Sequence, residues 1–131
     1  MFNAAARQFT LEVIARNRGK EHLVVLDEHW LPVLLGSIQF RTQVAIEDAE
    51  VTISVEDVEV LGFGSTLDEA LADALNELHT YALEFFAHPQ RYRGTYRERH
   101  APWLLRFLIT PENERRSLLT TPPTREESPA A

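Results

Sequence analysis

The sequence predicts a small α+β protein: an N-terminal helix plus β-hairpin, a small central antiparallel sheet, a long capped helix and a short C-terminal helix. Three observations predict this class. Apolar residues make up 44% of the 131 residues, which is enough for a hydrophobic core. Apolar and polar residues alternate over residues 38–55, as in half-buried strands, and residues 67–86 keep the apolar spacing of a helix. We expect three regions, at residues 1–36, 37–109 and 110–131.

The N-terminal region begins with a predicted helix over residues 3–18. Its apolar stripe recurs at helical steps and consists of Phe2, Ala6, Phe9 and Val13. A β-hairpin is predicted next, with strands at residues 22–26 and 30–35 around a polar turn. Pro32 lies inside the second of these strands and restricts it to a sheet edge or a bulge.

The central region contains two predicted antiparallel strands, at residues 38–46 and 51–55, joined by a turn at residues 47–48. After a short break, further apolar residues should extend the second strand. These are Val58, Val60 and Phe63. We expect Gly62 and Gly64 to loosen the end of this strand and let the chain turn.

A capping-box pattern marks the start of the long helix. The Thr66 hydroxyl should cap backbone N–H groups of the first turn, while the Glu69 side chain reaches back. Apolar residues then recur at helical spacing, which predicts a helix over residues 67–86. Pro89 should end it.

The C-terminal part opens with a polar, basic and aromatic segment at residues 88–100. Three interpretations of it stay open: a solvated loop, a protein or dimer interface, and a nucleic-acid contact. Pro102 then opens a short helix that is apolar nearly all round, so it must be buried in a core, a dimer or a partner. Residues 110–131 are rich in Pro, Glu, Arg and Ser and are predicted to be disordered.

Charge is distributed unevenly along the chain, whose net charge is −7. Ten carboxylates and no Lys or Arg lie from Glu47 to Glu77, whereas five Arg and one Glu lie from Arg91 to Arg106. The overall acidity argues against a surface that binds nucleic acid throughout and favours a basic partner. Ribonucleases and ribosome-directed toxins are often basic, because their targets are polyanions. A solvated acidic face explains the same pattern equally well.

Composition also limits the chemistry. The chain has no cysteine, which excludes disulfides, thiolate nucleophiles and cysteine-based zinc sites. We see no signal peptide and no apolar run near the length of a membrane span, so we expect a cytoplasmic protein that binds no membrane. The five His lie outside known catalytic motifs, and residues 62–66 lack the lysine of a phosphate-binding loop. We therefore expect no enzymatic activity, no cofactor and no metal site.

Several of these features together resemble one known family. They are the helix start Gly64–Leu71, the Tyr81-Ala82 step, the Arg91-Tyr92 pair and the run His100–Arg106. Spread over residues 38–109, they resemble the C-terminal region of Phd-like antitoxins of RelE/RelB-type toxin–antitoxin systems. The strand–strand–helix part alone is also similar to HicB-type antitoxins. The resemblance implies an antitoxin that binds and neutralises a small cognate toxin, a RelE-type ribonuclease.

Residues 4–36 resemble the core of prevent-host-death antitoxins. The matching positions are Ala6-Arg7, Phe9, Val13-Ile14 and Pro32–Leu35. The family's first strand is truncated here to Met1-Phe2, and residues 28–31 replace its basic, glycine-containing turn. The resemblance implies a dimerisation module that forms a homodimer, binds operator DNA and represses its own operon. The candidate DNA-binding residues are Arg7, Arg16 and Arg18.

The candidate partner-binding residues are aromatic and arginine side chains toward the C-terminal end, the residue types enriched at interface hot spots. They are Tyr81, Phe85, Arg91, Tyr92, Arg93, Tyr96, Trp103 and Phe107. Core packing is an alternative for Phe85, Trp103 and Phe107.

Two other functions remain open at this point. A non-catalytic ligand-sensing or orphan protein-interaction domain would have a closed apolar pocket. A small enzyme would need His79, His88 or His100 beside a carboxylate in a cleft.

Overall fold

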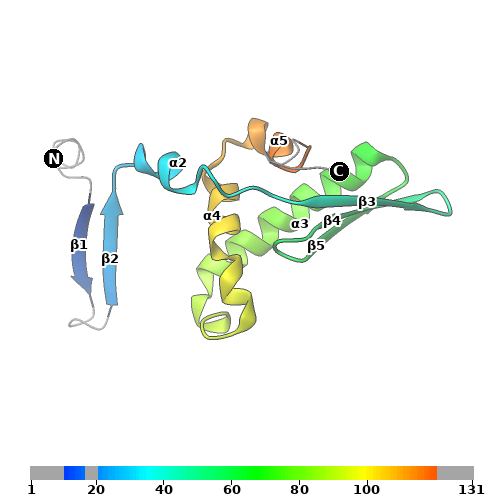
Figure 1. The fold of residues 1–131 in the computed structure, drawn as a ribbon. Helices are drawn as coiled ribbons and strands as arrows, with labels where there is room; N and C mark the ends of the chain where they lie inside the picture. Colours follow the sequence, from blue (N-terminus) through cyan, green and yellow to red (C-terminus); the bar gives the residue numbers. More distant parts are fainter. Residues whose placement is uncertain (1–10, 17–20, 121–131) are drawn as a thin grey trace, which may run out of the picture. The chain divides into compact units, whose positions relative to one another are not determined.

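The structure is a computed structural model that describes residues 11–16 and 21–120. The chain divides into two compact units, residues 1–37 and residues 38–131 (Figure 1). Helices and antiparallel sheets occur together, so the predicted α+β class is confirmed. Within the described ranges, no helix combines the length and the apolar composition that a membrane crossing needs.

The first unit is built on a two-stranded antiparallel sheet. Strand β1 (Leu11–Arg16) pairs with β2 (Glu21–Leu26). The helix predicted over residues 3–18 is therefore wrong over β1, and its other positions lie outside the described residues. β-Branched residues are common in both strands and favour extended backbone, and the register places Val13 opposite Val24.

A short helix, α2 (Trp30–Leu35), follows where the sequence predicted the second strand of a hairpin. That prediction is wrong, because the partner of β2 is β1. Pro32 lies in the first turn of α2, where a backbone N–H has no helical acceptor and proline is tolerated. The Asp27 side chain accepts a hydrogen bond from the His29 backbone N–H at 3.0 Å and fixes the turn before the helix.

The second unit contains a three-stranded antiparallel sheet in the order β3 (Thr42–Glu47), β4 (Glu50–Val55) and β5 (Val60–Gly64). Asp48 and Ala49 form the two-residue turn between β3 and β4, with φ angles of 51° and 64°. Positive φ at both turn residues is typical of a type I′ hairpin turn. The order leaves β3 and β5 as the two edges of the sheet.

Strand β5 is a separate strand and not an extension of β4, so the predicted extension by Val58, Val60 and Phe63 is corrected. The chain reverses at residues 56–59, where Glu59 has a φ of 60°. The Asp57 carboxylate holds this turn, because it accepts hydrogen bonds from the Arg41 backbone N–H at 2.7 Å and from the Arg41 guanidinium at 3.2 Å.

Helix α3 (Leu67–Ala87) lies across one face of the sheet (Figure 1). The predicted helix and its cap are confirmed, since the Thr66 hydroxyl accepts from the Glu69 backbone N–H at 3.1 Å. The Glu69 carboxylate reaches back to the Ser65 backbone N–H at 2.9 Å. The helix ends just before Pro89, as expected.

Two glycines on β5 let α3 approach the sheet closely. A Cβ added at Gly62 would lie 2.4 Å from both the Ala70 oxygen and the Ala74 nitrogen. A Cβ added at Gly64 would lie 2.5 Å from the Glu69 Cβ. Both positions thus require a residue without a side chain. The expectation that these glycines loosen the strand is corrected: they are points of tight helix–sheet contact.

The C-terminal segments complete the second unit. They are η2 (Pro89–Arg91), η3 (Tyr96–His100), α4 (Ala101–Ile109), η4 (Glu112–Glu114) and α5 (Arg115–Thr120). The helix predicted after Pro102 is confirmed as α4, and its apolar character follows from the burial of Leu104 and Phe107 in the core. The core also contains Val51, Ile53 and Val55 of β4 and the inward face of α3.

The predicted disorder from residue 110 onward is wrong over η4 and α5, while residues 121–131 lie outside the described residues. Leu119 is only 4% exposed, and its carbonyl accepts a hydrogen bond from the Thr42 hydroxyl at 3.0 Å. The Arg115 side chain donates to carbonyls at the end of α4, those of Phe107, Leu108 and Thr110. Tertiary contacts of this kind stabilise a helix too short to form alone.

Candidate partner-binding site

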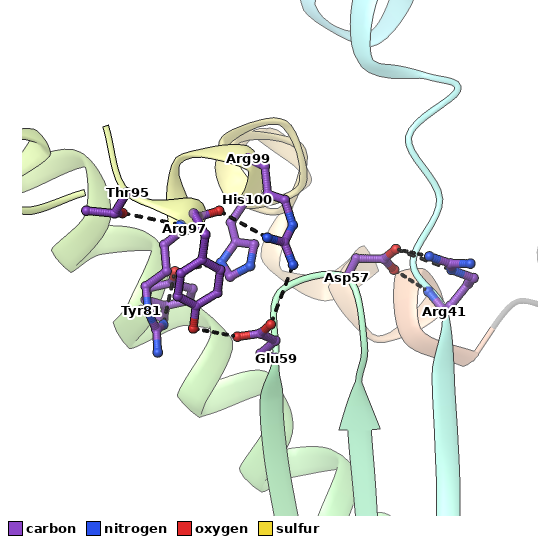
Figure 2. A network of polar contacts seen from close by, with 9 residues as sticks. Arg41, Asp57, Glu59, Tyr81, Thr95, Arg97, Arg99 and His100 are labelled. Atoms are coloured by element: carbon purple, nitrogen blue, oxygen red, sulfur yellow. Dashed lines mark hydrogen bonds and ion pairs between the residues drawn. The ribbon is translucent and has the colours of Figure 1, made fainter. Parts of the chain in front are cut away.

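The basic and aromatic segment that contains η3 meets the turn between β4 and β5. Five side chains contact one another there, and we call them the arginine–tyrosine cluster (Figure 2). They are Glu59, Tyr81, Tyr96, Arg97 and Arg99. The β4–β5 turn, α3 and η3 each contribute to it, so the cluster exists only in the folded unit.

Tyr96 is the exposed centre of the cluster. It is 56% exposed, yet its hydroxyl donates a hydrogen bond to the Glu59 carboxylate at 3.1 Å. The Arg97 and Arg99 guanidinium carbons lie 5.5 and 5.2 Å from the centroid of its ring, within the range of cation–π attraction. Arg99 also forms an ion pair with Glu59 at 3.6 Å. The ring is therefore held in one orientation on the surface.

The backbone around Tyr96 is fixed by local hydrogen bonds. Gly94 has a φ of 80°, a conformation that glycine adopts readily, and its N–H donates to the Glu98 carboxylate at 3.0 Å. The Thr95 hydroxyl accepts from the Arg97 N–H at 3.2 Å and caps η3. These turn and cap residues place Tyr96 and both arginines on the same side of the segment.

Beneath the cluster, a polar chain runs from Arg97 through Tyr81 to His100 (Figure 2). The guanidinium can only donate, so the Tyr81 oxygen accepts from Arg97 at 3.4 Å. The Tyr81 hydroxyl also forms a hydrogen bond with His100 Nδ1 at 2.7 Å, in which the tautomer of the imidazole decides the donor. Burial raises the pKa of the Tyr81 hydroxyl, although Arg97 works in the opposite direction. Burial also lowers the pKa of His100, which is fully buried, and Glu59 only partly opposes this. The imidazole is thus kept neutral.

Some predicted partner-binding residues lie in the hydrophobic core. Phe85 is 5% exposed and Phe107 is 1% exposed, so we correct their expected role: they hold the fold and have no surface to offer a partner. Tyr92 is half-buried and stacks on Phe85 with 4.7 Å between ring centroids. Trp103 is also half-buried, and its indole N–H donates to the Gln39 carbonyl at 2.9 Å.

The other predicted residues lie at the surface. Arg91 is exposed and pairs with Glu84 on α3. Arg93 is exposed as well. Tyr81 and Tyr96 are the two predicted aromatic residues that the structure brings into one cluster with arginines.

An open groove of about 480 Å³ continues from the cluster along the outer edge of β5. Its lining comes from β5, from the turn before it and from one side of α3 and includes Glu59, Leu61, Phe63, Asp73, Glu77, Tyr81 and Arg97. The sequence did not predict Arg97 and Arg99 of the cluster, nor Glu59, Asp73 and Glu77, as site residues. The spacing of Asp73, Glu77 and Tyr81 at four-residue steps could have indicated a shared helix face.

The predicted DNA-binding residues Arg7, Arg16 and Arg18 belong to the first unit. Arg7 and Arg18 lie outside the described residues, and Arg16 is the last residue of β1. In the described part of the chain, no group of three or more His, Asp or Glu side chains is arranged to hold a metal ion.

Comparisons with known proteins give the family. Residues 1–120 match the model of the PHD-like family, described as antitoxin of toxin–antitoxin, RelE/RelB, TA system. No curated protein has a matching sequence. The crystal structure of an antitoxin part of a proposed toxin/antitoxin system from Syntrophomonas wolfei subsp. wolfei is similar, with a TM-score of 0.72 and 17% identity over 90% of this chain and 86% of that chain. That likeness concerns the fold. The family match covers nearly the whole chain, and it confirms the resemblance found in the sequence: the chain belongs to the PHD-like antitoxins of toxin–antitoxin systems.

Proposed function

We propose that this antitoxin binds and neutralises a small RelE-type ribonuclease toxin through its arginine–tyrosine cluster. The observation that carries the proposal is Tyr96, an exposed aromatic ring that Glu59, Arg97 and Arg99 already hold in place. The family description, which names RelE and RelB, supports the class of toxin. Such a complex would form in the cytoplasm, where the RNA substrate of the toxin is found.

The physical argument is preorganisation. A surface tyrosine that is already ordered loses little conformational entropy on binding, so more of its contact energy appears as affinity. Tyr and Arg are also the residues that most often dominate binding energy at interfaces. The acidic chain, with a net charge of −7, would attract a basic toxin and raise the association rate.

Co-expression tests this proposal. The chain, with and without the paired substitutions Tyr96→Ala and Arg99→Ala, is produced together with the small protein encoded beside it. The unsubstituted chain should restore growth and co-purify with that protein, whereas the double variant should do neither. The matched control is Leu83→Ala, because Leu83 is a large apolar residue on α3 with a comparable 50% exposure. Equal rescue by the double variant and the control would reject the cluster as the toxin contact.

We also propose that the antitoxin represses its own operon as a homodimer through its first unit. The N-terminal resemblance supports this, together with Val33 and Leu34 of α2, which are 60% and 62% exposed. Sedimentation should show a dimer. A band shift on the promoter should disappear when Arg7, Arg16 and Arg18 are replaced by Ala. A monomer that shifts no DNA, alone or with toxin, would contradict this part of the proposal.

Binding, and not catalysis, is the activity that we propose for this chain. The His79 Nδ1 lies 3.4 Å from the Arg115 guanidinium, and the His100 Nδ1 contacts the Tyr81 hydroxyl. In the described part of the chain, none of His79, His88 and His100 forms a hydrogen bond with a carboxylate. The groove beside β5 is open and charged, unlike the closed apolar pocket of a ligand-sensing domain. These features favour a macromolecular partner.

A further inference from the structure

The free edge of β5 is covered in part by carboxylates from α3. The Ser65 backbone N–H donates to Glu69, and the Phe63 backbone N–H donates to Asp73, each at 2.9 Å. These helix–strand pairs can repeat at regular intervals, because four residues of a helix rise about 6 Å, which nearly matches the 6.7 Å or so that two residues of a strand rise. The next pair in the series is therefore Leu61 on the strand and Glu77 on the helix.

That third pair is not made. The Glu77 carboxylate has no hydrogen-bond or ion-pair partner among residues 21–120. The Leu61 N–H must point outward, because N–H groups of alternate residues on an antiparallel edge strand point the same way and that of Phe63 points to Asp73. Leu61 and Glu77 both line the groove beside β5. The groove thus contains an unoccupied backbone position of a sheet edge next to an unpaired carboxylate.

We propose that this position receives an extended, arginine-bearing segment of the toxin, whose backbone pairs with Leu61 and whose guanidinium binds Glu77. The inference rests on the proposed function, since it takes the toxin as the occupant. Asp73 occupies the N–H of Phe63, so the contact is confined to the end of β5 near the cluster and cannot extend along the whole strand.

Charge and shape favour a basic segment. Three carboxylates line the groove, from Glu59, Asp73 and Glu77, and Arg97 is the cation among the lining residues. Arg97 is already directed to the Tyr81 hydroxyl at 3.4 Å. The exposed side chains of Leu61 and Phe63, both 47% exposed, offer apolar surface for the neighbouring residues of an extended segment.

A short blocked peptide of alternating valine and arginine tests the groove without the toxin. Added to the full chain, it should shift the backbone amide resonances of Leu61 and Phe63, and a valine–glutamate peptide should not. Leu61→Pro removes the outward N–H at a position where an edge strand tolerates proline, and it also replaces the leucine side chain, so Leu61→Ala, which keeps the N–H, is tested beside it. Glu77→Gln removes only the charge. Glu77→Gln should weaken peptide binding by at least about tenfold, because a hydrogen bond to a charged group is lost, and Leu61→Pro by about fivefold, because a neutral backbone hydrogen bond is lost.

The other edge of the sheet supplies matched controls. Val44→Pro removes an outward N–H from β3, and Glu47→Gln removes a carboxylate from the same strand. Both variants should bind the peptide like the unsubstituted chain. Amide shifts confined to other segments, or equal affinities for the β5 and β3 variants, would overturn the inference.

The same variants are then tested with the purified toxin. If the toxin binds the unsubstituted chain and the β5 variants equally well, the groove is rejected as its binding site, while the proposed function stands. If the peptide binds at β5 but the toxin binds neither the unsubstituted chain nor any variant, the proposed function is rejected, and so is the toxin as the occupant of the groove. Circular dichroism spectra identical to that of the unsubstituted chain establish that each variant is folded.

Discussion

Replacing Gly62 by Ala should strongly destabilise the second unit. The added Cβ would lie 2.4 Å from the Ala70 oxygen and the Ala74 nitrogen and 2.6 Å from the Ala74 Cβ. Carbon atoms in contact prefer separations of about 3.5–4.0 Å, so α3 must retreat by roughly 1 Å. The obstacle is helix backbone, which cannot move aside as a side chain could.

The magnitude follows from that displacement. A gap of 1 Å forfeits up to about half of the dispersion energy between the surfaces it separates, and overpacking of a core commonly costs about 1–3 kcal/mol. We expect the upper end, about 3 kcal/mol, because Ala70 and Ala74 belong to the core between α3 and the sheet. For a unit of this size the melting temperature should fall by about 10–20 °C.

Urea and thermal unfolding followed by circular dichroism provide the assay. Gly94→Ala is the control, since a Cβ there meets no atom within 4 Å and only its φ of 80° is unfavourable. That strain should cost about 1 kcal/mol. A Gly62→Ala protein as stable as the original, or more stable than Gly94→Ala, would refute the close approach of α3 to β5.

Three further predictions concern stability. Burial lowers the pKa of His100 in the folded state, whereas an unfolded histidine has a pKa of about 6.5, so below that pH the unfolded state binds the proton more readily. The free energy of unfolding should therefore fall as the pH drops from about 6.5 to 5. The slope of this fall with pH should be shallower in His100→Gln. Equal slopes in urea titrations of both proteins would contradict the burial of a neutral imidazole. Arg115→Lys should lower the free energy of unfolding by about 2 kcal/mol, because a lysine cannot reproduce the forked contacts of the guanidinium with the three carbonyls at the end of α4. An unchanged urea midpoint would contradict this role of Arg115. Thr66→Ala should cost about 1 kcal/mol by removing the cap of α3, whereas Thr80→Ala, the same change at an exposed position inside α3, should cost less in the same urea titrations.

Local signals in the sequence predicted the elements that local interactions determine. Helix α3 carries its own cap at Thr66 and a continuous apolar stripe, so its limits could be read directly. Apolar and polar residues alternate along β3 and β4, and a two-residue turn joins the two strands. Helix α4 begins beside Pro102, as proline at a first turn indicates.

Elements that depend on distant partners were missed. Val13 and Ile14 fit a helical stripe as well as a strand, and only pairing with β2 selects the strand. The reversal before β5 has no glycine and depends on Asp57, which is held by Arg41 across the sheet. Helix α5 lies in a segment of disordered composition and is stabilised by Leu119 in the core.

The candidate site was predicted in composition but not in arrangement. Tyr81 and Tyr96 were predicted as contact residues and lie in one cluster, but the arginines beside them are Arg97 and Arg99. The predicted Arg91 pairs instead with Glu84, and Arg93 is exposed outside the cluster. Phe85 and Phe107 could not be told apart from surface aromatics by spacing alone, because both occur in segments with apolar residues on several sides. Glu59 was missed because its contact with Tyr96 joins residues far apart in the chain.

Hydrogen–deuterium exchange of the antitoxin, with and without its purified toxin, tests the toxin contact most directly. If the arginine–tyrosine cluster and the edge of β5 hold the toxin, exchange should slow at residues 59–63 and 94–100 and stay unchanged in the hairpin between β3 and β4. Slower exchange confined to the first unit, or no change at the cluster despite tight binding, would place the toxin elsewhere and contradict the account.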